Sequence, residues 1–79
     1  MKKKDIIAEI QKLEASYWLQ VKTTEVNFGE NHEFTSRQRS SWAALDSLMQ
    51  VIGVKSDPTL PDNLAAKILV LKKYNYISE

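Results

Sequence analysis

The sequence predicts an all-α fold, because apolar residues recur at helical spacing, glycines follow the first two apolar runs, and strand-like alternation is never sustained. Three helices are expected, over about 5–27, 36–52 and 61–73. They would form a small three-helix bundle, or a long helical hairpin with a short third helix packed across it. Residues 1–79 are expected to form a single domain, with flexible ends at 1–4 and 75–79.

The segment 5–27 contains neither proline nor glycine, and its apolar residues are spaced by three, four or seven positions. On a helical wheel, one stripe contains Ile6, Ile10, Leu13, Tyr17, Val21 and Phe28. Ile7 and Trp18 widen this stripe to roughly 140°, against the ~100° sufficient for a helix that rests on one neighbour. The first helix is therefore expected to contact more than one neighbour, and Gly29 is expected to end it.

Local motifs delimit the second helix. Thr35 followed by Gln38 matches the capping box S/T-x-x-E/Q, so this helix is expected to begin immediately after Thr35. Its apolar face contains Trp42, Leu45, Leu48, Met49 and Ile52. Gly53 can take the positive φ that often ends a helix, and Val54 would then complete a Schellman motif against Met49.

Both prolines of the chain lie between the second helix and the body of the third. Each disfavours α conformation in the residue before it, so Asp57 and Leu60 are expected to be extended or turn-like. Pro61 suits the first position of the third helix, because its missing N–H would have no helical partner there. The main apolar face of this helix is predicted to contain Leu64, Ile68 and Leu71.

The composition restricts both location and chemistry. A chain of 79 residues buries only about 60 to 65% of the surface that its unfolded form exposes, so its core must be thin. There is no cysteine, which excludes disulfides and thiolate metal sites and favours a reducing cytoplasm. The longest apolar run, 68–71, is far shorter than the ~20 residues that cross a bilayer. We expect a cytoplasmic protein without a membrane partner.

Groups suited to catalysis or metal binding are sparse. His32 and Glu33 are adjacent potential ligands, but a zinc site normally needs three or four and the chain has no second histidine. Ser40 or Ser41 would need an oriented base, and His32 is the only imidazole. The acids of the first helix that are expected on its solvated side are Asp5, Glu9 and Glu25. We predict no enzymatic activity and no metal or cofactor.

Local basic residues make nucleic-acid binding the alternative function. Acidic and basic residues number 10 and 11, so the chain as a whole is nearly neutral. Folding could still gather a basic patch from Lys2, Lys3, Lys4, Arg37, Arg39, Lys67, Lys72 and Lys73. A helix-turn-helix is excluded, because the gap after Gly53 is about twice the usual three or four residues and contains both prolines.

The quantity of apolar surface favours protein–protein contacts as the function. Leu19 and Val26 lie outside the stripe of the first helix, and three short helices cannot easily bury every such group. Large aromatic residues carry much of the binding energy of interfaces, which makes Tyr17 and Trp18 suitable anchors. We predict an interface formed by Tyr17, Trp18, Leu19 and Val26, for a second copy of the chain or a larger protein. Trp42 is expected in the core, where it would link the first two helices.

Overall fold

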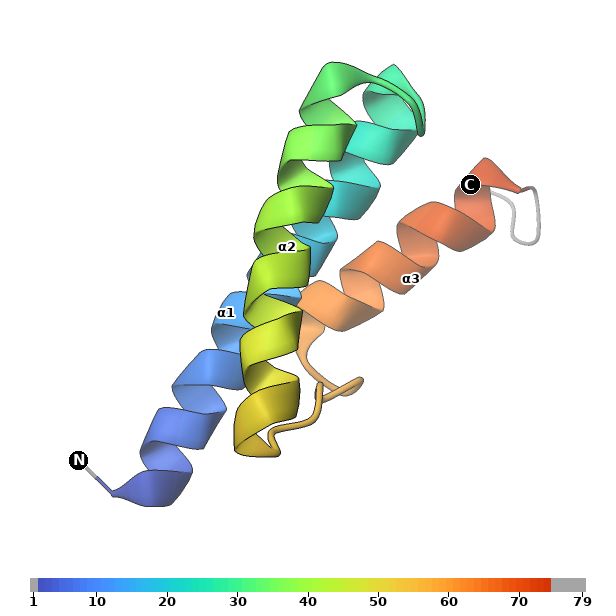
Figure 1. The fold of residues 1–79 in the computed structure, drawn as a ribbon. Helices are drawn as coiled ribbons and strands as arrows, with labels where there is room; N and C mark the ends of the chain where they lie inside the picture. The colour runs from blue at the N-terminus through green and yellow to red at the C-terminus, as the bar shows by residue number, and fades with distance from the viewer. Residues whose placement is uncertain (1, 75–79) are drawn as a thin grey trace.

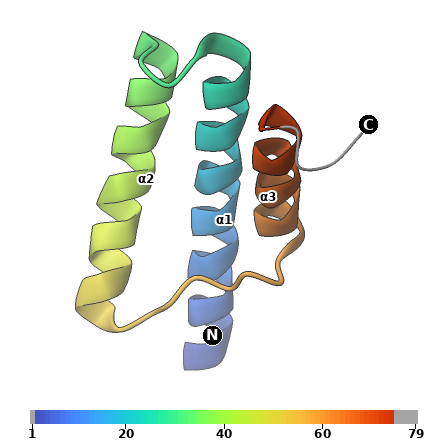
Figure 2. The ribbon, with the colours of Figure 1, turned by 90° about the vertical axis from the view of Figure 1, so that its right-hand side faces the viewer.

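Three α-helices make up the computed structural model, which describes residues 2–74. They are α1 (Lys3–Phe28), α2 (Glu33–Ile52) and α3 (Pro61–Lys73), and no strand occurs among the described residues. α1 and α2 form an antiparallel hairpin, and α3 packs on another side of α1 (Figures 1 and 2). The backbones of α2 and α3 do not contact each other. The predicted all-α fold is confirmed, in the form of a hairpin with a short third helix.

α1 begins earlier than predicted, at Lys3. Asp5 lies in its first turn, where a carboxylate is stabilised by the positive end of the helix dipole. The end predicted to be flexible, 1–4, is therefore partly helical. Residue 1 and the other end predicted to be flexible, 75–79, lie outside the described residues.

α1 packs against both α2 and α3, which confirms the prediction that it has more than one neighbour. Its buried residues are Glu14, Ala15, Val21 and Glu25, and of these only Val21 belongs to the predicted stripe. Three members of that stripe are exposed instead, namely Ile6, Leu13 and Phe28. Because α2 and α3 contact α1 on different sides, the buried face of α1 lies between these two contacts. One edge of the predicted stripe therefore faces solvent. The prediction that Glu25 is solvated is also wrong, because Glu25 lies at the same helical-wheel angle as Ile7, within the predicted apolar arc.

α3 packs through a small residue rather than through its large apolar ones. Ala66 is fully buried, whereas Leu64 and Ile68 of the predicted main face are about half exposed. A small side chain at a helix contact lets two helix axes approach closely. Ala15 of α1, which lies beside the beginning of α3, is buried as well. The predicted face of the third helix is therefore wrong in its orientation.

The turn between α1 and α2 consists of residues 29–32 and is shorter than predicted. Gly29 has φ 99° and ψ 157°, a conformation that residues with a Cβ rarely adopt. Its N–H donates to the Glu25 carbonyl at 3.0 Å. His32 is the N-cap of α2, where its Nδ1 accepts from the Phe34 N–H at 3.1 Å. The turn therefore supplies hydrogen-bond partners to both helix ends.

The predicted capping box at Thr35 is wrong. Thr35 lies inside the first turn of α2, where it is fully buried and its Oγ1 donates to the Gly29 carbonyl at 2.7 Å. The hydroxyl thus ties the beginning of α2 to the end of α1 instead of accepting from an early N–H. His32 caps the helix, and histidine is not among the residue types that mark an N-cap in a sequence. The predicted start is therefore too late.

The end of α2 is as predicted. Gly53 adopts the left-handed conformation, with φ 76° and ψ 25°. The Val54 N–H donates to the Met49 carbonyl at 2.9 Å, and the Gly53 N–H donates to the Gln50 carbonyl at 3.3 Å. These two hydrogen bonds define a Schellman motif, which gives partners to carbonyls that the helix itself leaves free.

The segment 53–60 carries the chain from α2 across α1 to α3 (Figure 2). Two side chains hold its backbone in place. The Gln11 Nε2 on α1 donates to the Lys55 carbonyl at 2.9 Å, and the Asn63 Nδ2 on α3 donates to the Asp57 carbonyl at 2.6 Å. The segment is therefore attached both to α1, which it crosses, and to α3, which follows it.

A tight turn within this segment sets the beginning of α3. The Asp57 Oδ1 accepts from the hydroxyl and the N–H of Thr59, at 2.6 and 2.9 Å. The hydrogen bond from the hydroxyl, followed by that from the N–H, lowers the pKa of the Asp57 carboxyl from its ordinary value. Leu60 is extended, as predicted, and Pro61 is the first residue of α3. Both proline-based predictions for this region are confirmed.

The enclosed core is very small. Among the described residues, the buried apolar side chains are Ala15, Val21, Met49 and Ala66. The molecule measures 41 × 27 × 16 Å, and its thinnest dimension is not much larger than the ~10–12 Å diameter of one helix. The three helices therefore form a thin layer, and such a layer cannot enclose large apolar side chains on both of its faces.

The N-cap of α2 gives a first testable expectation. His32→Ala removes the acceptor for the Phe34 N–H and should lower the free energy of unfolding by about 1 kcal/mol. His32→Asn loses the ring but keeps a capping oxygen, so it should retain most of that stability. Urea denaturation followed by circular dichroism measures both variants. Equal destabilisation by the two substitutions would show that the ring contacts, and not the cap, are what matters.

Candidate functional site

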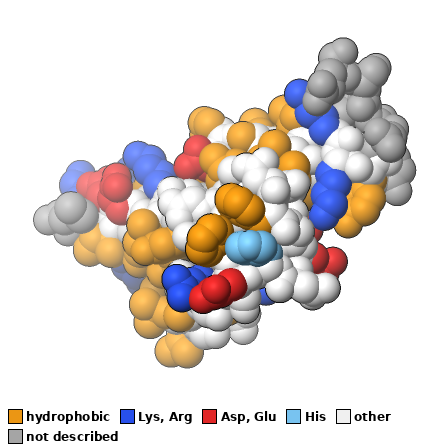
Figure 3. Space-filling model, turned by 90° about the horizontal axis from the view of Figure 1, so that it is seen from above, with side chains coloured by type: hydrophobic (Ala, Val, Ile, Leu, Met, Phe, Trp, Pro, Cys, Tyr) orange, Lys and Arg blue, Asp and Glu red, His pale blue; other side chains and the backbone are white. Residues whose placement is uncertain are grey.

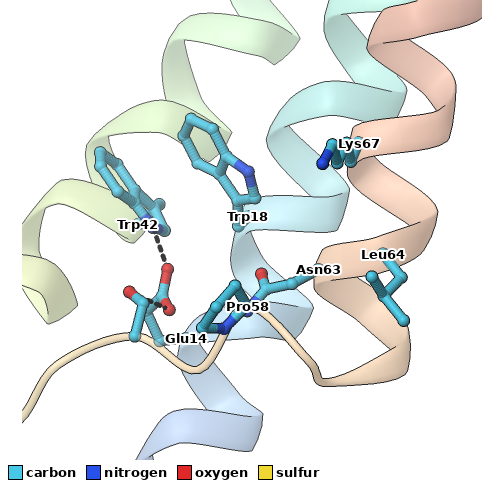
Figure 4. Close-up of a pocket in the computed structure, with 8 residues that line it drawn as sticks. Glu14, Trp18, Trp42, Pro58, Asn63, Leu64 and Lys67 are labelled. Atoms are coloured by element: carbon cyan, nitrogen blue, oxygen red, sulfur yellow. Dashed lines mark hydrogen bonds between the residues drawn. The ribbon is translucent and has the colours of Figure 1, made fainter.

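A buried carboxylate lies where α1, α2 and the segment 53–60 meet (Figure 4). Glu14 on α1 is only 2% exposed. Its Oε2 accepts from the Trp42 Nε1 at 2.6 Å, and its Oε1 accepts from the Ser56 Oγ at 2.7 Å. Among the described residues, no lysine or arginine forms an ion pair with it. Two neutral donors therefore satisfy this carboxylate, as burial of a polar group requires.

The two tryptophans of the chain contact each other beside Glu14. The ring centroids of Trp18 and Trp42 are 4.7 Å apart, with 47° between the ring planes. The Lys22 Nζ lies 4.5 Å from the centroid of the Trp18 ring, within the range of a cation–π interaction. The predicted role of Trp42 as a link between the first two helices is confirmed by these contacts.

Sequence reasoning missed Glu14, although a signal for it exists. Glu14, Trp18, Val21 and Glu25 follow each other at intervals of four, three and four residues. Such intervals place all of them on one face of a helix. An acid that shares a helical face with tryptophan and valine is a candidate for burial with dedicated hydrogen-bond donors.

A cleft opens between α2 and α3, with α1 as its floor (Figure 4). It has a volume of about 390 Å³. The residues that line it include Trp18, Trp42, Pro58, Asn63, Leu64 and Lys67. A neighbouring hollow shares Trp18 and Lys67 and continues to Lys22 and Val70. Together these hollows, called the α2–α3 cleft below, follow α3 over much of its length.

A second buried carboxylate, Glu25, gathers three cations near the α1–α2 turn. It is 8% exposed. Its Oε2 lies 3.3 Å from the Lys22 Nζ and 3.4 Å from the Arg39 Nη2, and its Oε1 lies 3.9 Å from the Lys73 Nζ. These pairs join α1 to both of the other helices. One carboxylate balances only one of three positive charges, so a positive charge remains at this position.

Four of the predicted basic residues lie on α3 or reach toward it. Arg39 and Lys73 contact Glu25, and Lys67 lines the α2–α3 cleft. Lys72 is exposed on α3. The part of the molecule around α3 therefore holds a local excess of positive charge.

The remaining predicted basic residues lie elsewhere. The Arg37 Nη2 is 2.6 Å from the Glu33 Oε1, in an exposed pair on α2. Lys2, Lys3 and Lys4 are exposed at the beginning of α1, at the end of the molecule away from the α1–α2 turn (Figure 1). The eight predicted nucleic-acid contacts are consequently spread over more than one region.

The residues of the predicted protein interface do not share one surface. Trp18 lies in the α2–α3 cleft. On the helical wheel Leu19 and Val26 lie about 80–100° to one side of Trp18, and Tyr17 lies about 100° to the other. Tyr17 and Leu19 are half-buried, and Val26 is exposed. Their role in binding stays a prediction, with only Trp18 placed in a cleft.

Exposed apolar residues also follow the α1–α2 hairpin. We call Ile6, Leu13, Leu48 and Ile52 the hairpin strip, and all of its members are about half exposed. Leu13 and Leu48 are equally far in sequence from the α1–α2 turn, so the antiparallel hairpin places them at the same level. The hairpin strip therefore includes matched apolar positions from both helices.

Helical periodicity places the hairpin strip away from the α2–α3 cleft. On α2, the buried Met49 lies between two differently directed residues. Arg39, which contacts Glu25, lies on one side of Met49, and Leu48 lies about 100° from Met49 on the other side. On α1, Leu13 lies about 140° from Trp18. The molecule thus has two distinct apolar surfaces, one on each side of its layer.

Comparison with known proteins leaves the function open. No family model, curated protein or solved structure matches the chain. Within residues 2–74, no group of three or more acidic or histidine side chains is arranged to hold a metal ion. None of the described helices combines the length and the apolar character that crossing a bilayer requires. The two apolar surfaces and the charges beside them are the features of the molecule that bear on its function.

Three aromatic rings cluster at the α1–α2 turn, near one end of the hairpin. The ring centroid of Phe28 lies 5.0 Å from that of His32 and 5.2 Å from that of Phe34, and His32 and Phe34 are 4.9 Å apart. Both phenylalanines are about half exposed. Figure 3 looks onto this end and shows hydrophobic side chains gathered around the histidine. These exposed rings add apolar area at the turn end of the hairpin.

The contacts of Glu14 give a second expectation. Glu14→Ala leaves the half-buried Trp42 Nε1 without its acceptor and should lower the free energy of unfolding by about 2 kcal/mol. Glu14→Gln keeps one side-chain oxygen as acceptor and should cost less. Glu30→Ala changes an exposed acid and serves as the control. Urea denaturation followed by tryptophan fluorescence compares the three, and equal stability of Glu14→Ala and Glu30→Ala would contradict the role given to Glu14.

Proposed function

We propose that this protein is a non-catalytic helical module that acts through protein–protein contacts, and that it associates with a second copy of itself through the hairpin strip. The observation that carries this proposal is the position of the strip. It is an apolar row on one side of a thin layer whose enclosed core consists of few residues. Contiguous exposed apolar area of this kind is typical of interaction sites.

A twofold axis would pair the two hairpins back to back. Each strip would then cover the other, and the four helices would form a bundle of antiparallel hairpins. Full burial of a leucine or isoleucine contributes about 1.5–3 kcal/mol, so a half-exposed one gains roughly half of that on association. Because association itself costs several kcal/mol, we expect a reversible, concentration-dependent dimer.

The charge distribution supports protein over nucleic acid as the partner class. Arg37, Arg39 and Lys73 each lie within 4 Å of a carboxylate oxygen. A phosphate backbone would have to compete with these carboxylates for the same cations. Nucleic-acid binding remains the alternative proposal, with Lys67 and Lys72 as the cations of α3 that would serve it.

Self-association is tested by the mass of the protein in solution. Light scattering after gel filtration, over a concentration series at about physiological salt, should show a monomer converting to a dimer. Leu48→Lys places a charge in the strip and should leave a folded monomer. Gln50→Lys is the matched control, because Gln50 is exposed and lies about 160° round α2 from both Leu48 and Ile52.

Two outcomes would contradict the proposal. One is a monomer at every concentration of the unmodified chain. The other is an equal loss of dimer in Leu48→Lys and Gln50→Lys, which would assign the effect to added charge in general. Circular dichroism of both variants establishes that each one is folded.

A further inference from the structure

We infer that the α2–α3 cleft binds an amphipathic helix of another protein, one that carries acidic residues beside its apolar face. This surface is separate from the hairpin strip, so the inference goes beyond self-association. It is carried by the shape of the cleft, by its apolar floor and by the sign of the charges around it.

The arrangement of the helices leaves a position for one more helix. α2 and α3 both pack on α1, and their backbones do not contact each other, so the groove between them is bounded on three sides. A fourth helix in this groove would contact both α2 and α3 and would complete a bundle around the Trp18 side of α1. From Asn63 to Lys73, α3 offers about 15 Å of wall, enough for two to three turns of a partner helix.

The floor of the cleft provides apolar anchoring. Trp18 and Trp42 lie in contact at its centre, and Leu64 and Val70 lie along the α3 side. Leu64 is 48% exposed. A groove lined in this way can bind an amphipathic helix, because apolar side chains at intervals of three and four residues on that helix contact the apolar side chains of the groove.

The charges around the cleft favour an acidic partner. The two acids, Glu14 and Glu25, are buried, whereas the cations lie nearer the surface. Lys67 lines the cleft and forms no ion pair with any described residue. Lys22 lines it as well, and Lys73 follows on α3, but both lie within 4 Å of a Glu25 carboxylate oxygen, so Lys67 is the cation that an acidic side chain can pair with directly. A partner that approaches the cleft therefore meets positive charge, which acidic side chains complement.

The tryptophans are poorly arranged for a nucleic acid. Bases bind to single-strand-binding proteins by stacking on open aromatic faces. Here the rings of Trp18 and Trp42 pack against each other, and the Lys22 ammonium lies over the Trp18 ring. The Trp42 N–H is also committed to Glu14. These contacts favour side chains of a helix over bases as the occupant of the cleft.

Tryptophan fluorescence tests the inference directly, because the chain has 2 tryptophans and both line the cleft. The probe is a synthetic amphipathic helix with leucine on one face, glutamate on the other and no aromatic residue. Its counterpart has lysine in place of every glutamate. We expect a saturable change in emission with the acidic peptide only, weakened by added salt.

Two charge reversals provide the matched comparison. Lys67→Glu reverses a charge in the cleft and should weaken binding of the acidic peptide by about tenfold or more. Lys4→Glu makes the same change in net charge at the far end of α1 and should leave binding unchanged. All titrations are repeated in the Leu48→Lys background, so that failure of self-association and failure of cleft binding are distinguished.

Three results would overturn the inference. The acidic peptide produces no saturable change up to about millimolar concentration, the acidic and basic peptides bind equally, or Lys4→Glu weakens binding as much as Lys67→Glu. A short oligothymidylate is titrated in parallel. Tighter binding of that oligonucleotide than of the acidic peptide would also overturn the inference and would assign the cleft to nucleic acid.

Discussion

The hydrogen bonds of the Glu14 carboxylate hold together three parts of the chain that are distant in sequence. Trp42 of α2 and Ser56 of the segment 53–60 both donate to this one side chain of α1. They fix the rotation of α1 about its axis, because a charged group can be buried at this position only while both donors face it. That rotation decides which apolar residues of α1 lie inside the layer. It also places Trp18 at the floor of the α2–α3 cleft.

The exposed surfaces follow from this rotation. Once α1 directs Glu14, Trp18 and Glu25 between its two neighbours, the apolar edge that contains Ile6 and Leu13 cannot be covered by the same chain. Extra helices would normally cover such an edge, and the described residues 2–74 form only three helices. The same shortage leaves the side of the layer between α2 and α3 open. Both proposed binding surfaces therefore have one physical origin. α1 has apolar residues on more sides than its two neighbouring helices cover.

Local rules predicted much of the fold from the sequence. The Schellman end at Gly53 and the start of α3 at Pro61 depend on the backbone preferences of a few consecutive residues, and both are present. The orientation of α1 could not be read from apolar spacing, because two of the four buried residues of this helix are the acids Glu14 and Glu25. Similarly, the contact of α3 depends on the smallness of Ala66, which a search for large apolar residues passes over. Arg39 and Lys73 are separated from the other predicted basic residues because both of them approach Glu25. This is a tertiary contact, and no local sequence pattern predicts it.

Native-state hydrogen exchange resolved by residue tests most directly whether α1 alone joins the other two helices. If it does, the slowest amides lie in α1 between Glu14 and Glu25, and α3 opens in a separate step at a lower free energy than α2. The difference is expected because α3 has 13 residues and α2 has 20, whereas each of them packs on α1 without support from the other. Equal protection of α2 and α3, or the slowest amides lying in α3, would contradict this description of the fold.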